Sequence, residues 1–74
     1  MAKIEQVQSI GDLHYLCSNG DQQEQYQKLL RISSHNLGSD SDEVDDQLNW
    51  LLTNASETSE EGVVDEINFC LDLI

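Results

Sequence analysis

The chain has 74 residues, of which 15 are Asp or Glu and three are Lys or Arg, so its formal net charge is −12. Such a charge disfavours direct binding to nucleic acid or to an anionic membrane surface, and it favours a basic protein surface as partner. The length allows one small domain, 1–74, around one core. Proline is absent and glycine is rare, which favours an all-α fold over a turn-rich β fold.

The acidic residues are concentrated in the second part of the chain. Residues 32–74 hold eleven of them and no Lys or Arg, whereas residues 1–31 hold four acids and all three bases. An excess of this kind costs folding stability through self-repulsion. The simplest explanation is solubility, or a salt-rich source, and the alternative is a surface adapted to a basic partner.

The first segment, residues 1–8, suits either a helix start or a short strand, and it is also a candidate disordered segment. Ser9 is then expected to cap a first helix, with Asp12 completing a capping box. The pair Asn19 and Gly20 is expected to end this helix. Its core stripe is predicted to be Ile10, Leu13, Leu16 and Cys17.

A second helix is predicted to begin after Asp21, with Glu24 as the capping-box partner. Its end is expected to fray near Ser33 and Ser34 and to stop at Gly38. The apolar residues that fall on one face at a period of 3.6 are Tyr26, Leu29, Leu30 and Leu37.

A third helix is expected to be capped by Ser39 or Ser41, and acids in its first turns suit the positive end of the helix dipole. A polar link over residues 54–58 should precede a fourth helix, with Thr58 as N-cap and Glu61 at the third position. The core stripes are predicted to be Val44, Leu48, Leu51, Leu52 and Ala55, followed by Val63, Val64, Ile67, Cys70, Leu71 and Ile74. The sequence therefore predicts a small compact bundle of about four short helices.

Carboxylates are predicted to line the faces of the third and fourth helices that lie opposite these stripes. Neighbours at i, i+3 and i+4 are about 5–6 Å apart at Cβ, a spacing comparable to that of phosphates along a strand. Two such acidic ridges would suit a basic groove on another protein. The candidate partner-binding residues are Asp42, Asp45, Asp46, Asn49, Trp50, Glu61, Asp65 and Asp72.

Three large apolar residues lie outside the main stripes. Trp50 either covers the edge of the core against the first or second helix or forms an exposed anchor beside Asp46. Phe69 and Leu73 form an i, i+4 pair that indicates central packing in the bundle or a dimer or partner contact. A regulatory adaptor, or a homodimer, with an aromatic-centred interface is therefore an alternative to purely acidic recognition.

Metal and catalytic motifs are not found. The acids from Asp40 onward depart from the calcium-loop pattern, because Val44 holds the fifth place and no glycine follows. His14 and Cys17 are i, i+3 neighbours on the first helix, but no oxyanion site accompanies them. We therefore expect no enzyme activity, no metal site and no cofactor.

The expected location is the cytoplasm. The first ten residues hold no apolar signal-peptide core, and no apolar run approaches the roughly 20 residues that a membrane span requires. Cys17 and Cys70 are far apart in the sequence and are expected to be reduced and buried.

One short segment suggests a different class of protein. Leu37, Gly38, Ser39, Asp40 and Ser41 resemble the Leu-Gly-x-Asp-Ser segment of acyl carrier proteins, which are also short, acidic and four-helical. The resemblance implies that Ser41 carries a phosphopantetheine arm. The chain departs from the family pattern after this serine, because Asp42 replaces an apolar residue and Gln47 replaces a leucine.

The expected function is that of a non-enzymatic interaction protein that binds a basic surface on a partner. Its sharpest form is a nucleic-acid mimic that blocks the DNA- or RNA-binding groove of a host enzyme or defence complex. This form rests on an analogy of size and charge with small acidic phage proteins. The alternatives are the carrier protein modified on Ser41 and the adaptor or dimer.

Overall fold

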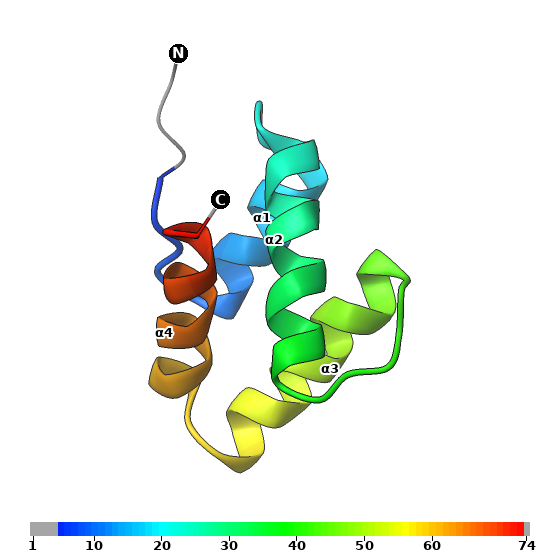
Figure 1. Ribbon diagram of the computed structural model, residues 1–74, viewed down its shortest axis with the longest axis vertical. Coiled ribbons are helices and arrows are strands. Elements are labelled where there is room, and N and C mark those ends of the chain that lie inside the picture. The colour runs from blue at the N-terminus through cyan, green and yellow to red at the C-terminus, as the bar shows by residue number, and fades with distance from the viewer. Residues whose placement is uncertain (1–4, 74) are drawn as a thin grey trace.

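A computed structural model describes residues 5–73 and shows a bundle of four helices (Figure 1). The helices are α1 (Ile10–Asn19), α2 (Gln23–Asn36), α3 (Val44–Glu57) and α4 (Glu60–Leu71). The described part of the chain contains no strand, so the predicted all-α class is confirmed. Residues 1–4 of the ambiguous first segment, and Ile74 of the predicted fourth stripe, lie outside the described residues.

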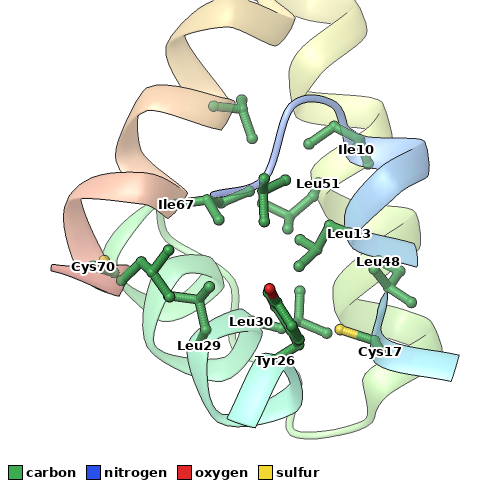
Figure 2. Packing of buried hydrophobic residues seen from close by; sticks show 13 residues of the cluster. Ile10, Leu13, Cys17, Tyr26, Leu29, Leu30, Leu48, Leu51, Ile67 and Cys70 are labelled. Carbon is green, nitrogen blue, oxygen red and sulfur yellow. The ribbon is translucent and has the colours of Figure 1, made fainter. Parts of the chain in front are cut away.

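The helices α2 and α3 each pack against all of the other helices, with α1 and α3 making the smaller contact, so α2 holds the most extensive contacts in the bundle (Figure 1). Figure 2 shows apolar side chains from all four helices pointing into one common interior. Burying each Val, Leu or Ile side chain contributes about 1.5–3 kcal/mol to folding, before the entropy cost of ordering the chain is subtracted. The core consists of Val7, Ile10, Leu13, Cys17, Tyr26, Leu29, Leu30, Leu48, Leu51, Val63, Ile67, Cys70 and Leu71.

The start of α1 agrees with the sequence, since the Ser9 hydroxyl accepts a hydrogen bond from the Asp12 backbone N–H at 3.0 Å. The Asp12 carboxylate accepts from the backbone N–H of Gln8 and not from that of Ser9. The capping box is therefore closed one residue earlier than predicted. The helix ends at Asn19, as expected, and Gly20 follows as the C-cap.

The predicted caps of α2 and α3 were each displaced. Gln22, and not Asp21, occupies the N-cap position of α2, which continues without fraying through the buried Ser33 and Ser34. The N-cap of α3 is Glu43, because the serines proposed for that role make other hydrogen bonds in the loop before the helix.

The link between α3 and α4 is shorter than predicted. The backbone N–H and the hydroxyl of Thr58 both contact the Asn54 carbonyl, so α3 extends through residues that were expected to form a polar link. Ser59 caps α4 instead of Thr58, and its hydroxyl accepts from the Gly62 backbone N–H at 3.3 Å. Two residues therefore connect the helices.

The core face of α3 is rotated relative to the predicted stripe. Leu48 and Leu51 are buried as expected, but Leu52 is 43% exposed and Gln47 is only 1% exposed. Gln47 tolerates this burial because its amide donates a hydrogen bond of 2.9 Å to the Ser41 carbonyl. The prediction failed here because a polar residue with a specific partner took a core position.

The extended segment before α1 is held against the bundle by side chains of two helices. The amide of Asn68 on α4 accepts from the N–H of Val7 and donates to its carbonyl, both at 2.8 Å. The Tyr26 hydroxyl on α2 donates to the Glu5 carbonyl at 2.8 Å. Asn68 thereby fixes the backbone of Val7, whose side chain lies in the core.

Removing the Asn68 amide should destabilise the fold. We expect Asn68→Ala to lower the free energy of unfolding by about 1–3 kcal/mol, because two hydrogen bonds to a buried segment are lost. Asn68→Asp should also destabilise, since a carboxylate cannot donate to the Val7 carbonyl. Urea unfolding measures both, and the control Asn49→Ala at an exposed position of α3 should change stability little. Equal stability of all three variants would contradict this role.

Burial also sets the chemistry of one thiol. Desolvation raises the pKa of the Cys17 thiol from 9.0 to about 11. The folded state therefore retains a proton that the unfolded chain releases above pH 9, and the resulting stability is complete below that pH. It is lost as the pH rises to about 11. The pKa of Tyr26 is raised as well, mainly by burial, which acts in the same direction.

Unfolding measured from neutral to alkaline pH should show this dependence. We expect the free energy of unfolding to fall between pH 9 and about 11, with a shallower fall in Cys17→Ala, which retains Tyr26. At neutral pH the native thiol should react with iodoacetamide far more slowly than the thiol of the urea-unfolded chain. Identical pH slopes in the two proteins would refute the assignment to Cys17.

Candidate protein-binding site

The exposed carboxylates of residues 32–73 gather in three places. The first, called here the acidic corner, comprises the loop after α2 and the first turn of α3 (Figure 1). The second surrounds the short turn between α3 and α4, and the third lies farther along α4. The members are Asp40, Asp42, Glu43, Asp45 and Asp46 at the acidic corner, then Glu57, Glu60 and Glu61, and lastly Asp65 and Asp72.

The structure thus brings together only some of the predicted site residues. Asp42, Asp45 and Asp46 lie at the acidic corner, and Asn49 is exposed one turn farther along α3. Glu61 lies in the first turn of α4, next to the C-terminal end of α3. That end is about 21 Å from the start of α3, because α3 has 14 residues. The two matching ridges expected from the sequence are therefore separate groups.

A Schellman motif turns the chain from α2 into the acidic corner. Gly38 has a φ of +114°, and its N–H donates to the His35 carbonyl at 3.1 Å. The N–H of Ser39 donates to the Ser34 carbonyl at 2.8 Å. These two bonds satisfy carbonyls at the end of the helix. The loop consequently leaves α2 in one defined direction.

The carbonyl of Ser41 anchors the middle of this loop to both flanking helices. His35 Nε2 on α2 lies 3.0 Å from it, and Gln47 Nε2 on α3 lies 2.9 Å from it. Because a carbonyl only accepts, the first contact requires the His35 tautomer that carries hydrogen on Nε2. A carbonyl with two donors on separate helices holds the acidic loop in place.

The side chain of Ser41 is also engaged within the protein. Its hydroxyl accepts from the backbone N–H of Glu43 at 3.2 Å and lies 3.4 Å from the Asp46 carboxylate. The residue is half-buried and precedes α3 by three positions. The hydroxyl that the carrier-protein resemblance marks for modification therefore orders the acidic corner.

Few positive groups offset this negative charge. His35 Nε2 lies 3.4 Å from an Asp42 carboxylate oxygen, which forms an ion pair only when the imidazole is protonated. In residues 5–73 this is the sole ion-pair contact, and neither Lys28 nor Arg31 on α2 lies within ion-pair distance of a carboxylate. The acidic corner therefore presents a negative potential that no salt bridge to Lys or Arg reduces.

Trp50 lies beside Gly38, where the acidic corner begins. The indole is half-buried and packs against the core. Its Cζ2 atom would lie 3.9 Å from a Cβ added at Gly38, so the ring lies beside the end of α2. This position matches the expectation that Trp50 covers the core edge, and the ring supports the loop that carries the acids.

Phe69 and Leu73 have the opposite environment. Phe69 on α4 is 59% exposed and Leu73 in the turn after α4 is 69% exposed, so neither is central in the bundle. Sequence reasoning did not identify Tyr15 or Leu52 as further exposed apolar residues. It also missed His35 and Gln47 as anchors of the acidic loop, and neither residue belongs to a recognisable local motif.

The described residues offer little for catalysis or metal binding. Within residues 5–73, no three His, Cys, Asp or Glu side chains are placed to hold a metal ion. His14 is exposed while Cys17 is buried, and the raised pKa of Cys17 keeps it a neutral thiol near pH 7.

Comparisons with known protein families, curated proteins and solved structures find no match to the chain. The search of the described residues finds no helix with the length and apolar character needed to cross a bilayer. The function must consequently be argued from the surface of the chain itself.

The backbone at Gly38 provides a test of the acidic corner as an ordered unit. We expect Gly38→Ala to destabilise the protein by about 1–3 kcal/mol, because a φ of +114° strains any residue with a Cβ. A Cβ there meets no close neighbour, so a steric clash is not the cause. Gly11→Ala within α1 is the matched control and should stabilise by up to about 1 kcal/mol. Thermal unfolding of both variants measures the difference, and a neutral Gly38→Ala would argue against an ordered loop.

Proposed function

We propose that the chain is a non-enzymatic protein that binds a basic surface on a partner protein through the carboxylates of the acidic corner. One observation carries this proposal: five exposed carboxylates are held on an ordered loop and helix start without salt bridges to Lys or Arg. A solubilising surface needs charge but no fixed geometry. Fixed carboxylates reduce the entropy cost of binding a partner whose charges are also fixed.

Part of the arrangement has a local explanation. Asp45 and Asp46 lie in the first turn of α3, where the helix dipole stabilises negative charge. Asp40 and Asp42 precede the helix, and their like charges add repulsion to a small domain with a narrow stability margin. Binding to a cationic surface would offset this loss of folding stability.

In its sharper form, the proposal is that the chain mimics nucleic acid and inhibits a DNA- or RNA-binding host enzyme or defence complex. Support comes from the size of the charge, −12, and from the close succession of acids at the acidic corner. The free, buried cysteines fit a reducing compartment such as the cytoplasm. On α3 the acids give way to the uncharged Asn49 and Thr53. A mimic of this kind would therefore imitate only a short segment of the phosphate backbone.

Charge reversal at the acidic corner tests the site. The immobilised chain should capture a partner from lysate at low salt and release it along a salt gradient, because screening weakens exposed charge pairs. The triple variant Asp42→Lys, Asp45→Lys and Asp46→Lys should lose this capture. If the chain is a mimic, added duplex DNA or RNA should displace it from the captured partner.

A matched variant separates geometry from net charge. Reversing Glu57 and Glu60 beside the turn between α3 and α4, together with Glu24 on α2, to Lys gives the same net charge, −6 instead of −12. Circular dichroism should first show that both variants remain helical. Capture should persist in this control and fail only in the acidic-corner variant. Unchanged capture by the acidic-corner variant would refute the site. Equal loss of capture in both variants would show that net charge alone determines binding.

A further inference from the structure

The outer face of α4 carries a second surface that the acidic corner does not include. Glu61, Asp65, Phe69 and Leu73 follow one another at four-residue intervals and are all exposed. Glu61, Asp65 and Phe69 lie within α4, where residues at this spacing occupy neighbouring turns on one side of the helix. Leu73 lies in the turn that follows α4, and its N–H donates to the Cys70 carbonyl at 3.0 Å. We call this row the α4 stripe: two carboxylates lead into two large apolar side chains. It lies opposite the side of α4 that faces the core.

The contacts of α4 show that the described chain leaves the stripe uncovered. On one flank, Asn68 binds the backbone of Val7. On the other flank, the Asn36 amide of α2 lies 3.5 Å from the sulfur of Cys70. The stripe runs along the side of α4 that neither of these contacts reaches. Phe69 in α4 is 59% exposed, and Leu73 in the turn just after α4 is 69% exposed.

The charge around this apolar pair indicates the chemistry of what covers it. Asp65 lies one turn before Phe69, Asp72 adjoins Leu73, and the last turn of α4 contains no basic residue. The negative end of the helix dipole therefore adds to the carboxylates. A second copy would bring the same acids close to their own equivalents, because a two-fold contact pairs identical surfaces. An apolar segment with Lys or Arg beside it has the complementary charge.

We propose that the α4 stripe docks an amphipathic, basic segment of a partner protein. Apolar side chains of that segment cover Phe69 and Leu73, while its Lys or Arg side chains meet Glu61 and Asp65. The inference rests on the proposed function, since it takes the same basic class of partner and adds an apolar contact at a different helix. Aromatic and aliphatic anchors of this kind supply most of the free energy in a protein interface.

Synthetic peptides test the α4 stripe without knowledge of the partner. The probes are an amphipathic Leu–Lys helix, a Gly–Lys peptide of equal charge and a Leu–Gln helix of equal length, each titrated calorimetrically. The full chain should bind the Leu–Lys helix most tightly. Phe69→Ser combined with Leu73→Ser should weaken that binding by about tenfold, which is 1.4 kcal/mol, and should leave Gly–Lys binding unchanged. Asp65→Lys should also weaken it.

The control pair is Tyr15→Ser with Leu52→Ser, which removes exposed apolar residues from α1 and α3 and should leave Leu–Lys binding intact. Unchanged Leu–Lys affinity in the Phe69 and Leu73 variant would overturn the proposal, as would equal binding of the Leu–Gln helix. Self-association of the wild-type chain that this variant abolishes would assign the stripe to a second copy instead.

The two proposals fail in different ways. Loss of Gly–Lys binding in the acidic-corner variant, with the stripe-dependent gain for the Leu–Lys helix retained, supports both surfaces. If the acidic-corner variant binds the Gly–Lys peptide as tightly as the wild-type chain does, the proposed function alone is refuted. If the wild-type chain binds the Leu–Lys helix no more tightly than the Gly–Lys peptide, the proposal for the α4 stripe alone is refuted.

Discussion

The carbonyl of Ser41 fixes the relation between the two halves of the chain. It accepts hydrogen bonds from His35 at the end of α2 and from Gln47 in α3, so the loop is held to both helices. The burial of Gln47 is tolerated because of this contact, and the core face of α3 is rotated accordingly. The rotation of α3 and the display of the acids thus depend on a single acceptor with two donors.

The fold accommodates its charge by keeping carboxylates outside an apolar core. Several carboxylates lie in the first turn of a helix, where the helix dipole partly stabilises their charge, as for Asp45 in α3 and Glu60 in α4. The acids of the preceding loop receive no such stabilisation, and only His35 lies close to one of them. A small core must therefore outweigh both chain entropy and self-repulsion. Side-chain hydrogen bonds such as those of Asn68, which fix the first segment, matter more in so small a domain.

Helical periodicity was enough to predict the all-α class, because apolar residues at a period of 3.6 require helices that bury one face. It was not enough for the ends of the helices. Thr58 and Ser59 both have hydroxyls suited to a cap, and the choice was decided by the extension of α3 over Asn54. The roles of Gln47 and Asn68 depend on partners that are distant in the fold or the sequence. The exposed carboxylates could be predicted, whereas their division into groups required the helix bounds.

The two proposed surfaces would act over different distances. Carboxylates at the acidic corner would attract a basic partner across about a Debye length, roughly 8–10 Å in physiological salt, and would mainly raise the rate of encounter. Phe69 and Leu73 contribute only in contact, where excluding water from apolar area slows dissociation. Salt should therefore weaken the first contribution much more than the second. A partner with both basic and apolar residues would be selected over a merely basic protein, because only that partner gains both contributions.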